Sequence, residues 1–169
     1  DDILAAYEHA FAACPRDDHR SGIVHVQLTR PDQLKKMQQL QLHAYVQTIF
    51  LDYDSRIVYS RAGDTLANTS YAFHSMKEMG MHVSNGTDCP VEYPDPMRGI
   101  QCAVTRQPLD GSLAPYRPEE AMSLEEAFRS YTCESAWASF EESKKGRIAP
   151  GMLADFVILS DNPFETEPA

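Results

Sequence analysis

Three short β-prone runs, separated by helical patterns, restrict the fold of this chain more than any other feature of its sequence. The runs are residues 23–27, 44–50 and 82–84. Strands that alternate with helices are typical of parallel β/α units and not of a sandwich or a helical bundle. The sequence therefore predicts an α/β fold with a parallel sheet.

The helices between these runs are marked by apolar residues at helical spacing. We predict helices over residues 2–14, 31–40, 70–79, 96–106 and 123–145. A capping box at Ser123 and Glu126 opens the last and longest of them. Residues 55–68 have no clean period and are predicted to form a long active-site loop with at most one helical turn.

Asp88 lies just past the end of the third run and is the first candidate for chemistry. Asn85 and Gly86 supply a turn that ends the strand, so the carboxylate follows the strand's carboxyl end. In parallel α/β folds that edge binds ligands and holds catalytic residues. The alternative is an Asx-turn carboxylate that bonds only its own loop.

Composition and length limit the function further. The chain has 169 residues and a formal net charge of −10, which argues against nucleic acid or an anionic membrane as a partner. Its four cysteines form no CxxC pair, so reduced thiols and a cytoplasmic location are expected. A complete eight-fold β/α barrel typically needs about 250 residues, so the chain is too short to form one.

Two segments resemble one known family. The segments are Gly-Thr-Asp-Cys-Pro-Val at residues 86–91, with Asp-Pro and Ala-Val-Thr-Arg following it, and Gly-Arg-Ile-Ala-Pro-Gly-Met-Leu-Ala-Asp at residues 146–155. Together they resemble the eighth-strand region and the C-terminal return segment of metal-dependent amidohydrolases of the YtcJ and AepA-like group. The resemblance extends in order over nearly the whole chain.

The resemblance implies roles for two residues. Asp88 corresponds to the aspartate that binds the catalytic metal and carries the proton of the attacking water. His25, in the first β-prone run, corresponds to a metal-ligating histidine, although a lone histidine in an apolar strand is more often a core residue. Asp52 and Asp54 follow the second run, where they are either substrate contacts or a solvated turn.

The resemblance also implies an architecture. Residues 1–145 correspond to strands six to eight of a (β/α)8 TIM-type barrel with their covering helices. Residues 146–169 correspond to the return segment that enters a small β-sandwich as a last strand. The family's other metal ligands would lie upstream of Asp1, so this chain is expected to be the C-terminal portion of such an enzyme and inactive by itself.

The implied function is hydrolysis of a C–N bond, in an amide or cyclic amide, by metal-activated water. The expected cofactor is a divalent metal, zinc, in the intact enzyme, with none held by this chain alone. A small-molecule substrate is expected, and the cut barrel is expected to self-associate or to pair with the missing N-terminal half. The alternatives are ester or phosphoester hydrolysis in the same superfamily and a non-catalytic assembly module.

Overall fold

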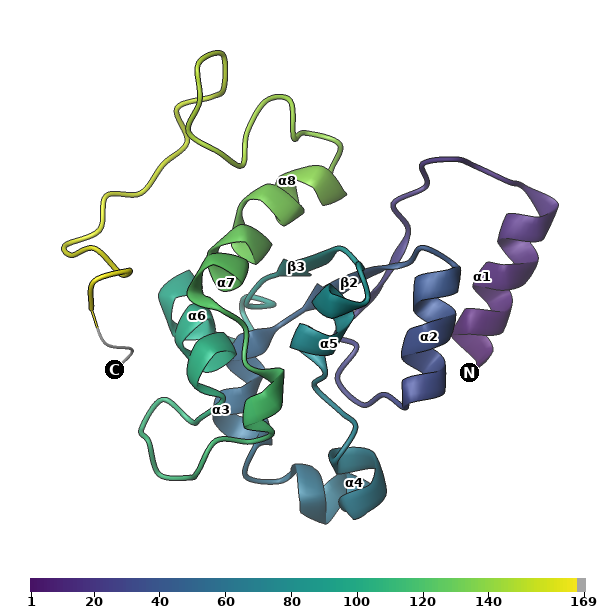
Figure 1. Ribbon diagram of the computed structural model, residues 1–169, viewed down its shortest axis with the longest axis horizontal. Coiled ribbons are helices and arrows are strands. Elements are labelled where there is room, and N and C mark those ends of the chain that lie inside the picture. The colour runs from purple at the N-terminus through teal and green to yellow at the C-terminus, as the bar shows by residue number, and fades with distance from the viewer. Residues whose placement is uncertain (167–169) are drawn as a thin grey trace.

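The computed structural model describes residues 1–166, in which a three-stranded parallel sheet is surrounded by short helices (Figure 1). The strands are β1 (Gly22–Val24), β2 (His43–Val46) and β3 (Val83–Asn85). The helices are α1 (Asp2–Ala13), α2 (Pro31–Gln39), α3 (Leu51–Asp54), α4 (Val58–Ala67), α5 (Phe73–Glu78), α6 (Pro96–Thr105), α7 (Leu124–Tyr131) and α8 (Cys133–Ala138), with 3-10 turns η1 (Thr48–Phe50) and η2 (Pro118–Glu120). Within residues 1–166 no helix has the length and apolar content that a membrane span requires.

The sheet has the order β1-β2-β3, and both pairs are parallel. Gly22 lies opposite His43, and Ala44 lies opposite Val83. All three strands therefore end at the same edge of the sheet. The prediction of parallel β/α units is confirmed.

The two faces of the sheet differ in character because successive strand residues point to opposite sides. Ala44, Val46 and Val83 are fully buried on one face. They belong to one hydrophobic cluster with residues of α2, α5 and α6: Leu34, Met37, Phe73, Met76, Ile100, Cys102 and Ala103. The other face carries His43, Tyr45 and Ser84 together with Val24, which is 56% exposed. Helices thus cover the apolar face, and the polar face is partly open.

The strands are shorter than the sequence indicates. β1 ends at Val24 because His25 and Val26 take left-handed backbone angles, with φ of 72° and 46°. β2 ends at Val46, and the turn η1 follows because the amide of Thr48 donates to the side chain of Asn85 (3.1 Å) instead of continuing a ladder. The prediction of strands over residues 23–27 and 44–50 is therefore wrong at their carboxyl ends.

Residues 55–68 are helical, so the predicted loop is wrong. Helix α4 occupies most of this segment, and Gly63 breaks it with a φ of 74°. Val58, Ala62 and Leu66 recur every four residues across the break, so the helical spacing is present in the sequence. Helix α5 begins at Phe73 instead of Ser70, whose hydroxyl donates to the carbonyl of Leu66 (2.7 Å) and accepts from the amide of Thr29 (3.3 Å).

The predicted helix over residues 123–145 is divided in two. Its capping box is present, since Ser123 Oγ accepts from the amide of Glu126 and the Glu126 carboxylate accepts from the amide of Ser123. The helix then leaves helical geometry at Thr132, with φ −119° and ψ −86°. Helix α8 continues only to Ala138. The lysines expected at the helix end lie beyond it.

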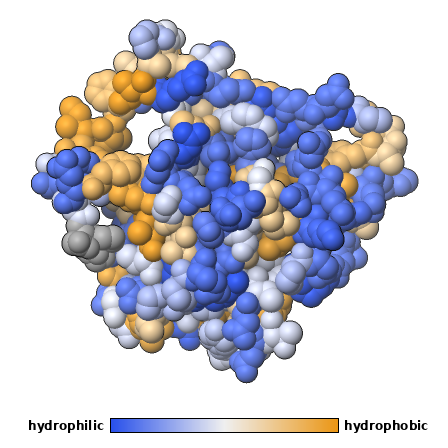
Figure 2. Space-filling model, viewed as in Figure 1, coloured by the Kyte–Doolittle hydropathy of each residue, from blue (hydrophilic) through white to orange (hydrophobic). Residues whose placement is uncertain are grey.

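The expected last strand at residues 156–159 is absent from the described chain. These side chains are exposed, with Val157 at 81% and Ile158 at 85%, and no strand within residues 1–166 pairs with them. A strand requires a neighbouring ladder, and the tail here runs away from the sheet (Figure 1). Figure 2 shows the resulting apolar surface in orange at the upper left, where Figure 1 places this tail.

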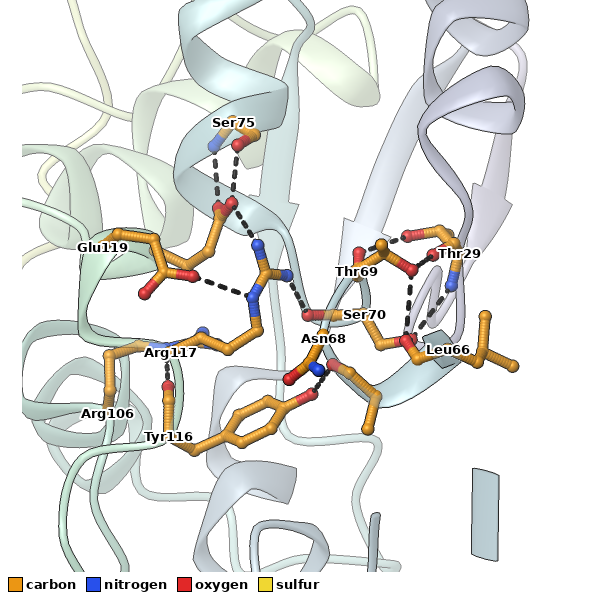
Figure 3. A network of polar contacts seen from close by, with 12 residues as sticks. Thr29, Leu66, Asn68, Thr69, Ser70, Ser75, Arg106, Tyr116, Arg117 and Glu119 are labelled. Carbon is orange, nitrogen blue, oxygen red and sulfur yellow. Dashed lines mark hydrogen bonds and ion pairs between the residues drawn. The ribbon is translucent and has the colours of Figure 1, made fainter. Parts of the chain in front are cut away.

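A polar network joins the loop before α7 to the helices around it (Figure 3). The Arg117 guanidinium donates to the Ser70 carbonyl (2.6 Å) and to the Glu120 carboxylate (3.0 Å). Glu120 also accepts from the amide and hydroxyl of Ser75. The guanidinium of Arg106 is fully buried and packs over the ring of Phe73. These contacts fix the segment that carries η2 against α5.

Candidate active site

The carboxyl edge of the sheet brings the two predicted site residues together. His25 follows β1 directly, and Asp88 lies three residues beyond β3. His25 Nε2 lies 4.0 Å from Asp88 Oδ2, and both side chains are nearly half exposed, at 44% and 43%. The two residues therefore face each other across the carboxyl edge of the sheet. Their metal-binding role is a separate question.

The backbone fixes the direction of the His25 ring. The His25 amide donates to the carbonyl of Tyr45 (2.7 Å), and the Val26 amide donates back to the carbonyl of Val24 (3.0 Å). This tight turn gives His25 and Val26 positive φ values, which are unusual for residues with a Cβ and most unusual for a β-branched valine. The turn lifts the imidazole off the sheet and aims it across the edge.

The loop after β3 places Asp88. The amide of Gly86 donates to the carbonyl of Val46 (3.1 Å), which holds the loop against β2. Asn85 also accepts from the Thr48 amide, so the ends of β2 and β3 are joined. Asp88 has a φ of 54°, and its carbonyl accepts from the amide of Val91 (2.8 Å). Within the described chain, the Asp88 carboxylate makes no hydrogen bond, and its nearest basic partner is His25 at 4.0 Å.

A separation of 4.0 Å is too long for a hydrogen bond. Two ligands of one tetrahedral zinc lie about 3.4 Å apart, since Zn–N and Zn–O distances are each about 2.0–2.2 Å, so this pair would approach by about 0.6 Å to bind one ion. A neutral imidazole nitrogen and a carboxylate oxygen are both good donors to zinc. Within residues 1–166, however, no group of three or more His, Cys, Asp or Glu side chains is arranged to hold a metal. The described chain thus places two candidate ligands, His25 and Asp88, at this edge.

Gln47 is a site residue that sequence reasoning did not identify. Its side chain is 6% exposed, and its Oε1 lies 2.8 Å from Nδ1 of His25. The signal that could have identified it is a glutamine at the end of a buried strand, because a buried amide needs a partner. Which partner it finds depends on the register of β1 and β2.

Asp52 and Asp54 both serve the fold. Asp52 accepts from the amide of Leu109 (2.8 Å). Asp54 accepts from Gln27 (2.9 Å) and from the hydroxyl of Tyr71 (2.8 Å). Burial and the Asp54 carboxylate raise the pKa of Tyr71, so it remains a donor. The sequence left open substrate contacts or a solvated turn, and the structure instead places both carboxylates in α3 with hydrogen bonds inside the fold.

Two hollows lie at opposite edges of the sheet. One of about 200 Å³ lies on the carboxyl side and is lined by residues that follow β1 and β2, including Gln27, Asp54 and Arg61. The larger, of about 280 Å³, lies on the amino side and is lined by His43, His82 and residues before β1. The larger hollow therefore lies away from His25 and Asp88, and neither residue lines it.

A serine and a histidine meet near the larger hollow. Ser84 Oγ lies 2.7 Å from His43 Nε2, the geometry of a nucleophile and its base. Burial, and then the nearby His82, lower the pKa of His43 to about 4. A base this weak activates a hydroxyl poorly near neutral pH. The pair is better explained as buried polar groups that satisfy each other.

The profile described as "Amidohydrolase family" matches residues 1–169. The chain belongs to the amidohydrolase family. Its resemblance to the YtcJ-like group is confirmed by the Bacillus subtilis protein named putative amidohydrolase YtcJ, which is 30% identical over 156 residues, or 92% of this chain and 30% of that protein.

Two other relatives of this amidohydrolase chain extend the comparison. Protein LONG AFTER FAR-RED 3 of Arabidopsis thaliana is 35% identical over 98% of the chain and 28% of its own length. N-substituted formamide deformylase of Arthrobacter pascens is 34% identical over 56% of the chain and 17% of its own length. The chain thus spans less than a third of the length of the curated relatives it matches.

Solved structures agree with the family and with the mixed α/β fold. A metal-dependent hydrolase from Pyrococcus furiosus aligns over 96% of the chain with a TM-score of 0.79 and 29% identity. A second, from Pyrococcus horikoshii, aligns over 98% with a TM-score of 0.82 and 26% identity. The amidohydrolase chain covers 31% and 32% of these two structures.

Proposed function

We propose that this chain is the C-terminal portion of a metal-dependent amidohydrolase that hydrolyses a C–N bond in an amide or cyclic amide. The observation that carries the proposal is the facing pair of His25 Nε2 and Asp88 Oδ2, 4.0 Å apart at the carboxyl edge of a parallel sheet. The name of the deformylase relative supports C–N chemistry. The names of the two Pyrococcus structures support a metal.

The residues present fit a divalent metal only in part. His25 Nε2 and Asp88 Oδ2 would hold it, and zinc accepts both donor types. A catalytic zinc usually takes three protein ligands plus water, so further ligands would come from outside this chain. When bound, the metal lowers the pKa of a water molecule and polarises the substrate carbonyl. We therefore expect the chain alone to be inactive.

Asp88 would carry the proton in this reaction. Its carboxylate is nearly half exposed and has no hydrogen-bond donor within the described chain, so its lone pairs are open to water. Asp88 would accept a proton from the attacking water and deliver it to the leaving nitrogen. His25 would serve as a ligand through Nε2. A small-molecule substrate would enter from the open carboxyl edge.

The architecture is part of the proposal. We infer that β1, β2 and β3 are strands six to eight of a (β/α)8 barrel, covering residues 1–145, and that residues 146–169 return to a small β-sandwich. The parallel order of the strands supports this, as does a length less than a third of that of the relatives. In such a barrel the face with Val24, Tyr45 and Ser84 would line the interior.

The test is mutagenesis in the full-length enzyme that carries this chain. Asp88→Asn is expected to reduce kcat at least about 1,000-fold, since it removes both a ligand and the proton carrier. The fold should be unchanged, because the side chain is exposed and its carboxylate makes no hydrogen bond within the described chain. His25→Ala is expected to lower both the metal content and the rate.

A matched control is Asp110→Asn, which alters an exposed loop carboxylate that pairs with Arg56. It should leave the rate within about two-fold of the unmodified enzyme, since surface changes away from a site rarely alter activity. If the Asp88→Asn enzyme retained most of its turnover on amide substrates, the assigned role of Asp88 would be wrong. Turnover confined to esters or phosphoesters would favour the alternative hydrolase.

A further inference from the structure

The end of β2 carries a buried amide that the proposed chemistry has not yet used. Gln47 follows Val46 with extended backbone angles, φ −130° and ψ 90°, so its side chain lies on the same face as that of Tyr45. Only 6% of Gln47 is exposed. Leaving a buried polar group without a partner costs about 1–3 kcal/mol, so the amide must be bonded.

The partner of that amide is the imidazole of His25. Gln47 Oε1 lies 2.8 Å from His25 Nδ1. The ring of Phe50, three residues further on, stacks against the imidazole with a centroid separation of 5.9 Å and an interplanar angle of 29°. The backbone amide of His25 donates to the carbonyl of Tyr45, which lies in β2 two residues before Gln47. One segment therefore fixes the main chain, the ring plane and one ring nitrogen of His25.

These contacts favour one ring nitrogen as the site of the proton. A neutral imidazole has one N–H, and it goes where an acceptor is available. Gln47 Oε1 is within hydrogen-bonding distance of Nδ1, whereas Asp88 Oδ2 is 4.0 Å from Nε2 and out of range. The proton therefore belongs on Nδ1, and Nε2 presents its lone pair toward Asp88.

We propose that Gln47 is a positioning residue that holds His25 in the Nδ1–H tautomer and orients Nε2 for binding a divalent metal. The metal part of this inference rests on the proposed function. The tautomer part does not, because it rests on the contact between Gln47 Oε1 and His25 Nδ1. The opposite arrangement has the Gln47 amide turned so that its NH2 donates to Nδ1, which would put the imidazole proton on Nε2.

The tautomer can be read directly by NMR. The 15N-labelled, metal-free chain is studied at alkaline pH, where an imidazole is neutral, and long-range 1H–15N correlations assign the protonated nitrogen of His25. We expect Nδ1–H in the unmodified chain and in Gln47→Glu, which keeps an acceptor. Gln47→Met, of similar size, should shift the population toward Nε2–H.

The control is Gln107→Met, since the Gln107 amide donates to the Leu113 carbonyl (3.1 Å) outside the site. It should leave the His25 signals unchanged. An Nε2–H tautomer in the unmodified chain would overturn the inference, and so would an unchanged tautomer in a folded Gln47→Met chain. If that variant does not fold, the unmodified and Gln47→Glu spectra still decide the assignment.

The metal part is tested in the full-length enzyme by competition with a chelator for zinc. Loss of such an orienting hydrogen bond typically lowers metal affinity about 10–100-fold. Gln47→Met should show that loss, and Gln47→Glu should not. Unchanged affinity in Gln47→Met would remove the metal role. An Nδ1–H tautomer in an enzyme that binds no zinc would leave the tautomer assignment standing and contradict the proposed function instead.

Discussion

Residues at the candidate site hold backbone conformations that are costly elsewhere. His25, Val26 and Asp88 all have positive φ although each has a Cβ. Such conformations cost on the order of 1–3 kcal/mol each and persist only where surrounding contacts impose them. Here the bonds from β2 and from the loop after β3 impose them. The sequence could place Asp88 just past the end of its strand, but it put His25 inside a strand and gave no sign of this backbone geometry.

Acidification should destabilise the chain through His43. Burial, and then the charge of His82, lower the pKa of His43 to about 4, while Glu134 opposes and Lys77 adds to the effect. At pH values between about 4 and about 6.5, His43 is protonated in the unfolded state and neutral in the folded state. Stability is therefore unaffected above pH 6.5 and falls below it, by about 3 kcal/mol at most.

Urea unfolding at pH 7.5, 6.0 and 5.0 measures this dependence. His43→Asn should flatten the pH profile between pH 6.5 and 5, because it removes the titrating group while retaining a polar side chain beside Ser84. Glu134 contributes in the same direction only nearer pH 4, since burial raises its pKa but bonds from His82 and Lys77 lower it more. An identical profile in the variant would show that another group is responsible.

Sequence periodicity predicts where most helices and strands lie, but it predicts their first and last residues poorly. The alternation of apolar residues identified all three strands and most helices because it reports which side of an element is buried. The ends depend on contacts that are distant in sequence. The strand β2 stops where Thr48 bonds Asn85, 37 residues later, and no local pattern records that contact. In α4 the apolar spacing at Val58, Ala62 and Leu66 is helical, and the prediction of a loop overlooked it.

Helices α6 and α7 approach closely at Gly99, and this contact gives a prediction at the scale of elements. A Cβ at Gly99 would lie 2.0 Å from Oη of Tyr131. That hydroxyl is buried and has no hydrogen-bond partner within the described chain. Gly99→Ala gains about 1 kcal/mol of helix propensity but overpacks the contact at a cost of about 1–3 kcal/mol. We expect a net destabilisation of about 1 kcal/mol.

Thermal or urea unfolding of a double variant separates the two effects. Tyr131→Phe removes the crowded oxygen, so Gly99→Ala should be less destabilising in that background than alone. Gly86→Ala is the control, because no atom lies within 4 Å of the Cβ it would add. Equal effects of Gly99→Ala in both backgrounds would mean that the hydroxyl is not the source of the crowding.

One face of the sheet and its two outer strand edges are only partly covered by the rest of the described chain. Val24 is 56% exposed on the polar face, and β1 and β3 each have one edge without a strand partner in residues 1–166. Helix α1 packs beside α2 in Figure 1 and does not cover Val24. Parallel sheets are normally covered on both faces, and open edges recruit other strands.

We therefore propose that the chain is not a monomer when it is alone in solution. It should pair with a second copy, or with the rest of its enzyme, through these edges or this face. Light scattering over a dilution series, in low and high salt, measures the mass. The net charge of −10 opposes association, so higher salt should favour the pair. A monomer that persists at micromolar concentration in both salts would contradict the pairing.

The exposed tail has a consequence for the behaviour of the chain in concentrated solution. Phe156, Val157, Ile158 and Leu159 form a run of β-prone apolar residues without proline, and runs of this kind nucleate cross-β aggregates when they are accessible. Asp155 and Asp161 flank the run and act as gatekeepers, since stacking identical segments would bring their charges together. Colloidal stability of the chain thus depends on two carboxylates that take no part in its fold.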